Sequence, residues 1–249
     1  MRDELAGAAR DLAAYIKALD DTLVGAASAR PAAEAAPAPL PPPSGPAAPA
    51  DMQSLAEQVR NCRKCGLGVS RLNAVFGVGT FRARIVFVGE GPGFQEDHQG
   101  EPFVGRSGQL LDKIMETVLG LKRRDVYIAN IVKCHPMKNP ADPESRGNDR
   151  PPTPDEIAAC RPYLDAQLGF IRPACIVTLG SVPTKVLLST DKGISLMRGK
   201  WADYSPGNGA EPIKLMPTYH PAALLRNPNL KRDTWEDMKM VKAFLGTLE

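Results

Sequence analysis

Several features of membrane proteins and nucleotide-binding enzymes are missing from this chain of 249 residues. No apolar run is long enough to cross a bilayer. The first four residues, Met-Arg-Asp-Glu, already include two acids, whereas a secretory signal needs a basic start and an uninterrupted apolar core. The glycine-rich turn at residues 89–93 fits neither the dinucleotide fingerprint nor the P-loop. We therefore expect a cytoplasmic protein, and the turn gives no reason to expect a nucleotide cofactor.

A strong charge of either sign is also missing. The 31 Lys and Arg residues nearly balance the 28 Asp and Glu residues, which leaves a net charge of +3. So small an excess permits a polyanionic partner without requiring one. Any nucleic-acid binding must therefore come from local clusters of basic residues. The hydrophobic content of 43% is ordinary for a folded domain and allows a sizeable core.

Cysteine is scarce, and the five cysteines do not suggest a disulfide framework in a cytoplasmic chain. Cys175 lies in an apolar, strand-like run, which is typical of a small buried side chain. Cys62 and Cys65 form a C-x-x-C pair, and Cys134 and Cys160 follow far downstream. Four thiolates can bind zinc or an iron–sulfur cluster. The wide split between Cys134 and Cys160 is unlike a zinc ribbon and favours a cluster. Zinc, or four unligated thiols, remain alternatives.

The N-terminal fifth of the chain differs in composition from the rest. Residues 1–25 have apolar side chains at helical spacing, which predicts an amphipathic helix. Residues 26–50 are nearly all Ala and Pro, so we expect a disordered linker that cannot bury a core. The helix either packs on its own domain or is a tethered peptide for a partner protein. The folded domain is expected over residues 51–249.

The turn at residues 89–93, Gly-Glu-Gly-Pro-Gly, directly follows a run at residues 84–88 that has the composition of a buried strand. A glycine-rich turn at the end of a strand lets the backbone approach a ligand closely, and Glu90 supplies a carboxylate there. On its own this pattern is also compatible with simple chain reversal. Its meaning depends on the rest of the chain.

Strand-like and helix-like segments alternate along the chain, which predicts a parallel sheet covered on both faces. We expect a three-layer α/β/α fold with a central, mostly parallel, four-stranded sheet. Residues 74–79 are predicted to be an edge strand or a hairpin arm, and residues 197–204 a hairpin arm. Ser107 is expected to cap the helix that Gly120 ends. The four strands are predicted at residues 84–88, 125–132, 174–179 and 214–217.

Three polar residues, Glu90, Asn130 and His220, come at or just after the ends of predicted strands. In an open α/β sheet these ends share one crevice, so we expect the three side chains to converge. Alone, Asn130 could make a local turn bond and His220 could lie in an ordinary turn. Phe103 follows the glycine turn and either stacks on a planar ligand or anchors its loop in the core. His98 and His135 are expected on loops.

A possible nucleic-acid contact follows His220. Two leucines, Leu224 and Leu225, stand beside Arg226 and are expected to be exposed on a loop. Apolar wedges flanked by cations suit insertion into a base stack. Further basic residues could reach phosphates, namely Lys231 and Arg232.

Taken together, these motifs resemble the family-four uracil-DNA glycosylases, the iron–sulfur type. The resemblance covers roughly residues 52–248 and includes the motif order, the spacing and all four cysteines. Residues 1–50 lie outside it. The motifs are Gly89-Glu90-Gly91-Pro92-Gly93 with Glu96-Asp97, Pro102-Phe103-Val104-Gly105, Tyr127 through Cys134, and His220-Pro221 with Leu225-Arg226-Asn227-Pro228.

The resemblance implies a site for uracil in DNA. By similarity, the base is flipped out of the duplex, Phe103 stacks on it, and Asn130 reads its O4 and N3 edge. The backbone around Glu90 and Gly91 holds the base, while His220 donates to O2, where negative charge develops. The resemblance also implies a 4Fe–4S cluster on the ligands Cys62, Cys65, Cys134 and Cys160.

Two departures from related patterns leave questions open. Gly91 stands where the best-known glycosylases carry an aspartate that positions water, so Glu90 or Glu96 is expected to take that role. Residues 139–150 form an apparent insert. A related branch traps uracil-DNA covalently through a histidine in a basic insert at this location, but residues 139–150 contain no histidine.

The sequence therefore favours a monomeric, monofunctional uracil-DNA glycosylase in base-excision repair, with uracil-containing DNA as its partner. Two alternatives remain: a catalytically weak DNA-binding or replication-associated module that keeps the fold and the cluster, and a variant that traps uracil-DNA covalently.

Overall fold

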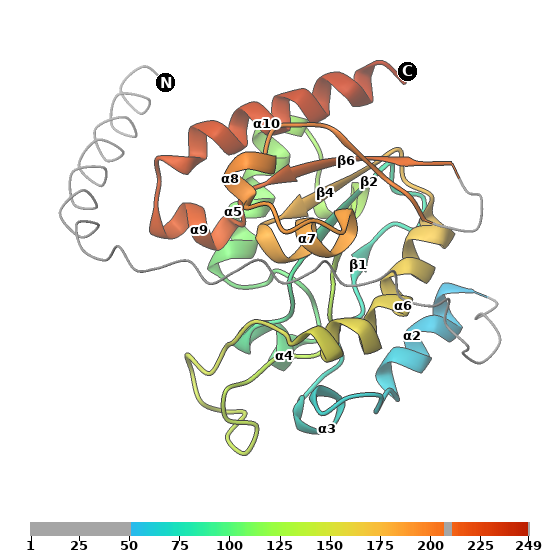
Figure 1. Ribbon diagram of the computed structural model, residues 1–249, viewed down its shortest axis with the longest axis vertical. Helices are drawn as coiled ribbons and strands as arrows, with labels where there is room; N and C mark the ends of the chain where they lie inside the picture. Colours follow the sequence, from blue (N-terminus) through green and yellow to red (C-terminus); the bar gives the residue numbers. More distant parts are fainter. Residues whose placement is uncertain (1–50, 207–210, 249) are drawn as a thin grey trace.

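The computed structural model describes residues 51–206 and 211–248, so the expected helix over residues 1–25 and the linker over residues 26–50 lie outside the described residues. The described chain forms a central sheet with helices on both faces (Figure 1). In Figure 1, α10 (Leu230–Gly246) crosses above the sheet, and α6 (Pro154–Ile171) and α2 (Met52–Arg60) lie below it. Within the described ranges, none of the helices has the length and apolar character needed to span a membrane.

The sheet has six strands in the order β1-β3-β2-β4-β6-β5. The central four are parallel, which confirms the predicted parallel core. The two outer strands pair antiparallel to their neighbours and lie within residues 74–79 and 197–204, the segments predicted as an edge strand or hairpin arm and as a hairpin arm. The strands are β1 (Val78–Gly79), β2 (Ile85–Gly89), β3 (Tyr127–Asn130), β4 (Cys175–Leu179), β5 (Ala202–Tyr204) and β6 (Ile213–Thr218).

Alternate residues of the buried strands enter two separate cores, as the two-residue period of a strand requires. Val86 and Val88 of β2 point to the face covered by α2 and α6. Ile85 and Phe87 point to the opposite face, which α5 (Arg106–Ile114) and α10 cover. Burial on both faces explains why β2 reads as a continuous apolar run rather than an alternating one.

Local signals define several helix ends. The side chain of Asp51 accepts a hydrogen bond from Ser54 N and starts α2. Thr153 and Glu156 form a capping box at the start of α6, with Pro154 as its first residue. Gly105, not Ser107, is the N-cap of α5, so the expected cap is wrong. A π-helical turn, Met115–Leu119, extends α5 to Gly120, which ends it as expected.

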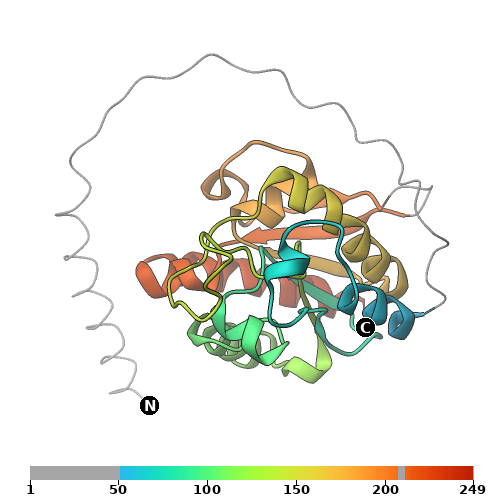
Figure 2. The ribbon, with the colours of Figure 1, turned by 90° about the horizontal axis from the view of Figure 1, so that it is seen from below.

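The remaining helices are short and lie mostly at the carboxyl ends of the strands (Figure 2). They include α4, which follows the glycine turn, and α9, which begins directly after His220. These helices are α3 (Leu67–Ser70), α4 (Phe94–Gln99), the 3-10 turn Arg123–Asp125, α7 (Ser181–Leu188), α8 (Ile194–Met197) and α9 (Pro221–Arg226).

Candidate active site

A crevice of about 750 Å³ opens at the carboxyl ends of the parallel strands. Glu90, Asn130 and His220 all line it, so the predicted convergence of three strand-end residues is confirmed. Phe103 and Gly91 line the same crevice. The size and position are typical of a small-molecule site in an open α/β sheet.

The glycine turn is held against the end of β3. Gly89 pairs with Asn130 in the sheet, and the carbonyls of Gly89 and Glu90 accept hydrogen bonds from Ile131 N and Val132 N. A Cβ atom added to Gly91 would lie 2.8 Å from Val132 Cγ2, so a side chain at this position would require the Val132 side chain to move. The turn therefore presents backbone groups to the crevice.

Asn130 is the most deeply buried polar group in the crevice, with 2% of its surface exposed. Its Oδ1 has no hydrogen-bond partner among the described residues. A buried amide oxygen without a partner costs roughly 1–3 kcal/mol. A ligand with an N–H donor at this position would recover this energy, whereas no local turn bond to this oxygen is present among the described residues.

Phe103 combines burial with an unusual backbone conformation. Its φ is 55°, a left-handed value that is costly for a non-glycine residue. Arg123 holds this strained segment, donating to the carbonyl of Phe103 at 3.0 Å and to that of Pro102 at 2.6 Å. The Phe103 ring lies 5.6 Å from the His220 ring, measured between centroids. Sequence analysis missed Arg123, because its targets lie about twenty residues away and no local motif signals them.

His220 is neutral and its tautomer is defined. Its Nδ1 accepts a hydrogen bond from Ala222 N at 3.1 Å, at the start of α9. A nitrogen that accepts cannot carry the proton, so the proton lies on Nε2. Burial, assisted by the nearby charge of Arg226, lowers the pKa of His220 to about 4. At neutral pH, His220 is therefore an uncharged Nε2–H donor beside the crevice.

The two candidate carboxylates differ in their surroundings. Glu96 is fully engaged: Oε1 accepts from Val104 N and Gly105 N, and Oε2 accepts from Gly93 N, all within 3.1–3.2 Å. Glu96 thus ties the glycine turn to the Phe103 loop. Within the described chain, the Glu90 side chain makes no hydrogen bond, and burial raises the pKa of Glu90. Glu90, not Glu96, is the carboxylate whose oxygens remain available.

The run after His220 differs in part from expectation. Leu224 is wholly buried in the core beneath α9, so its expected exposure as a wedge is wrong. Leu225 is half-buried and lines the crevice, as does the exposed Arg226. Lys231 and Arg232 are exposed at the start of α10.

The four cysteines outside β4 surround a second cavity, below the sheet. Its walls also include three basic residues, Lys64, Arg71 and Lys133. No group of three or more His, Cys, Asp or Glu among the described residues is arranged to hold a single metal ion. Cys175 is fully buried within the opposite core, as expected. The lining cysteines are Cys62, Cys65, Cys134 and Cys160.

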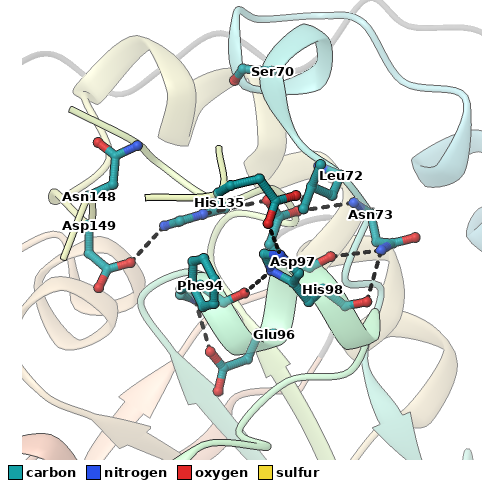
Figure 3. A network of polar contacts seen from close by, with 12 residues as sticks. Ser70, Leu72, Asn73, Phe94, Glu96, Asp97, His98, His135, Asn148 and Asp149 are labelled. Carbon is teal, nitrogen blue, oxygen red and sulfur yellow. Dashed lines mark hydrogen bonds and ion pairs between the residues drawn. The ribbon is translucent and has the colours of Figure 1, made fainter. Parts of the chain in front are cut away.

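A buried polar network that the sequence did not indicate joins α4 to the segments that carry Asn73 and His135 (Figure 3). The ring of His135 is 1% exposed and stands between Asp97 and Asp149, with Nε2 at 2.7 Å from Asp149 Oδ1 and Nδ1 at 3.5 Å from Asp97 Oδ2. Burial alone would lower the pKa of His135, but the hydrogen bonds to the two carboxylates raise it to about 9. Asp97 Oδ1 also accepts from Leu72 N and Asn73 N, both at 3.0 Å.

Of the two histidines expected on loops, only His98 needs correction. His98 lies in α4 rather than on a loop, and its ring contacts Glu144 at 3.0 Å. His135 follows Cys134 in irregular backbone, as expected, but it is a core residue. Their partners lie 14 to 46 residues away, so no short motif could identify them.

Comparison with known proteins agrees with this site. Residues 76–239 match the family model of the uracil DNA glycosylase superfamily. The type-4 uracil-DNA glycosylase of Sulfurisphaera tokodaii is 44% identical over 195 residues, which cover 77% of this chain and 83% of that protein. The type-4 uracil-DNA glycosylase of Saccharolobus solfataricus is 42% identical, over 79% of this chain and 88% of that protein. The type-4 uracil-DNA glycosylase of Thermotoga maritima is also 42% identical, over 78% of this chain and 94% of that protein. The chain belongs to the uracil DNA glycosylase superfamily and, within it, to the type-4 uracil-DNA glycosylases.

Proposed function

We infer that this protein is a uracil-DNA glycosylase, which takes deoxyuridine out of the DNA stack and hydrolyses its N-glycosidic bond to release uracil in base-excision repair. The observation that carries the proposal is the pairing of an unsatisfied amide oxygen, Asn130 Oδ1, with a neutral imidazole donor, His220, in one crevice. Family membership supports the same activity.

The base is recognised by shape and by hydrogen bonds. Phe103 stacks on the uracil ring, and its strained loop, clamped by Arg123, keeps the ring in position. Asn130 Oδ1 accepts from N3–H, while its amide donates to O4. Cytosine presents an acceptor at N3 and a donor at its exocyclic nitrogen, so it mismatches the amide at both atoms. Thymine is excluded by its methyl group.

Bond cleavage is driven by stabilisation of the leaving base. The C1′–N1 bond breaks with its electron pair passing to uracil, and His220 Nε2–H donates to O2, where the charge accumulates. A preorganised donor of this kind contributes about 3–4 kcal/mol. His220 can act in its neutral form, because the Nε2–H of an uncharged imidazole donates a hydrogen bond to O2 while the proton stays on the nitrogen. Water then adds at C1′ and loses a proton, with Glu90 as the carboxylate that orients it. Glu96 acts as a positioning residue for the pocket.

Contacts to DNA come from the segment after His220. Leu225 fills the space that the flipped nucleotide leaves, and Arg226, Lys231 and Arg232 bind phosphates. The protein acts as a monomer in the cytoplasm. Size-exclusion chromatography with light scattering, with and without DNA, checks the oligomeric state, and a stable dimer would contradict it.

The second cavity suits a 4Fe–4S cluster better than zinc. A four-iron cluster uses one thiolate for each iron, so its ligands surround a volume instead of converging on one atom. All four cysteines line this one small cavity, of about 10 Å³, so four thiols from separate segments are available at one place. Three hydrogen bonds already point at the sulfurs: Arg71 Nη1 to Cys134 at 2.9 Å, Lys133 N to Cys160 at 3.2 Å and Lys64 N to Cys62 at 3.5 Å.

When bound, such a cluster supplies a structural cross-link between the segment of Cys62 and Cys65 and the rest of the domain. Protein purified without oxygen should be brown, with about four irons per chain and a broad absorbance near ~400 nm. A colourless protein that contains stoichiometric zinc would contradict the cluster.

The activity is tested with a uracil-containing oligonucleotide. Incubation followed by alkali should cut the strand at the uracil and leave a thymine-containing strand intact. The absence of cleavage would support a binding module instead. A shifted band that survives detergent would support covalent trapping.

A further inference from the structure

The apparent insert, residues 139–150, forms an ordered loop with its own internal scaffold. Asn148 is buried and links both sides of the loop: Nδ2 donates to the carbonyls of Asn139 and Asp142, and Oδ1 accepts from Asn139 N, all within 2.8–2.9 Å. The two ends of the loop are joined by the bridge between Met137 and Asp149. A loop held in this way presents its side chains in a fixed arrangement.

Three contacts dock this loop on α4 and the segment that follows Cys134. Asp149 pairs with His135 at 2.7 Å, Glu144 pairs with His98 at 3.0 Å, and the Arg146 guanidinium lies 5.8 Å from the centre of the Phe94 ring. In the first contact the His135 side chain is buried, whereas in the second the Glu144 side chain is exposed. The His135–Asp149 pair is therefore the main attachment of the loop.

The loop forms one side of the active-site crevice. Phe94, Asp149 and Arg150 line the crevice together with Asn130 and His220. In Figures 1 and 2 the yellow-green loop projects from the same side of the molecule as α9. DNA bound with its uracil in the crevice and α9 against its backbone would pass close to the loop.

The charges of the loop are partly neutralised by its contacts. Glu144 and Asp149 are paired with histidines, and Arg150 makes a two-point ion pair with Glu156. Arg146 is exposed, and no carboxylate of the described residues lies within ion-pair distance of it. Asp142 is the loop carboxylate outside these pairs. Arg146 is thus an exposed cation beside Phe94, a residue that lines the crevice.

We propose that the loop of residues 138–150 is a second DNA-binding element, in which Arg146 binds a backbone phosphate of the uracil-containing strand and the His135–Asp149 pair holds the loop in place. This inference rests on the proposed function, because it assumes that DNA occupies the crevice. Arg146 is planar, fully charged and already oriented, which suits phosphate binding.

Steady-state kinetics and salt dependence of Arg146→Gln test the phosphate contact. The variant should keep its kcat, because Arg146 does not touch the base, and should raise KM for uracil-DNA about fivefold at low salt. The slope of log Kd against log salt, measured with duplex containing the uncleavable 2′-fluorodeoxyuridine, should become shallower by about 0.9. Arg172→Gln is the matched control, since Arg172 is an exposed arginine between the end of α6 and the start of β4, whereas the crevice opens at the carboxyl ends of the strands.

The outcomes separate this inference from the proposed function. A wild-type protein that neither cleaves nor binds uracil-DNA overturns the proposed function. If the wild-type protein cleaves uracil-DNA and Arg146→Gln has the same KM and the same salt slope, the inference is overturned and the proposed function stands.

Asp149→Ala tests the attachment through a readout that does not depend on activity. Trypsin can cut after Lys138 and after Arg146, and mass spectrometry can follow both sites. Loss of the attachment should speed cleavage after Arg146 about tenfold while the rest of the domain resists. The 2′-fluorodeoxyuridine duplex should protect the wild-type loop, and Asp149→Glu should restore slow cleavage. Glu144→Gln, which alters only an exposed pair, is the control. Equal cleavage of Asp149→Ala and wild type would contradict the role of the His135–Asp149 pair.

Discussion

The neutrality of His220 leads to a quantitative prediction about pH. Its pKa falls from the ordinary 6.5 to about 4. Each pKa unit corresponds to about 1.4 kcal/mol, so protonation of His220 in the folded protein costs about 3 kcal/mol more than in the unfolded chain. At pH 7 roughly one molecule in a thousand carries the imidazolium form. The contribution of His220 to the rate should therefore stay constant as the pH falls through 6.5 and well below it.

The assay is single-turnover release of uracil between pH 4.5 and 8, with wild type and His220→Leu. Wild type should show no inflection near pH 6.5 that depends on His220. The variant should lose roughly 10²–10³ in rate, as expected for removal of one oxyanion-type donor, by the same factor across this range.

Stability supplies an independent check with a defined sign. The unfolded chain binds a proton at His220 below pH 6.5, whereas the native state binds it only near pH 4, so wild type loses stability as the pH falls through this window. The loss approaches about 3 kcal/mol relative to His220→Leu. Two results would contradict a neutral His220. One is a rate inflection near pH 6.5 that wild type shows and His220→Leu lacks. The other is a free energy of unfolding in urea that depends on pH equally in both proteins.

Four further substitutions give direct tests. Asn130→Asp replaces the amide donor by a carboxylate and should reduce discrimination between uracil and cytosine, measured with competing oligonucleotides; unchanged uracil kinetics would remove Asn130 from the site. Leu224→Ala should lower the free energy of unfolding by about 2–5 kcal/mol in urea titrations. Leu225→Ala should leave stability within about 1 kcal/mol and raise KM for DNA instead; the reverse pattern would contradict the burial described for this pair. Arg123→Met should lower kcat/KM by loosening the Phe103 loop, and an unaltered value would show that the loop holds itself.

Features that depend on local periodicity could be predicted from the sequence. The buried run ending at Gly89 and the strand ending at Asn130 are apolar segments with polar residues at their ends, and parallel strands bring such ends together. The sequence alone therefore predicts Glu90, Asn130 and His220 in one crevice. The cysteine spacing indicated a metal or cluster site, although it did not choose between zinc and iron.

Features that depend on distant contacts could not be predicted in this way. Leu224 and Leu225 are neighbours on a helix of six residues, too short for periodicity to show which one faces the core. The packing of α9 against the core determines which of the two leucines is buried, and that residue is Leu224. His135 gains its role from Asp97 and Asp149, and Arg123 gains its role from the Phe103 loop. None of these pairs is adjacent in sequence, and each forms only when the loops fold over the sheet.

The absence of an aspartate at Gly91 makes the fate of the water molecule the most informative observation. The central claim is that the crevice hydrolyses the N-glycosidic bond of deoxyuridine in DNA. Purified protein should be incubated with uracil-containing oligonucleotide in water enriched in oxygen-18, and both products analysed by mass spectrometry. We predict free uracil without the label and, when the abasic strand is reduced with borohydride at once to stop exchange of the C1′ oxygen, one labelled oxygen at C1′. Absence of free uracil, or DNA that remains attached to the protein, would contradict it.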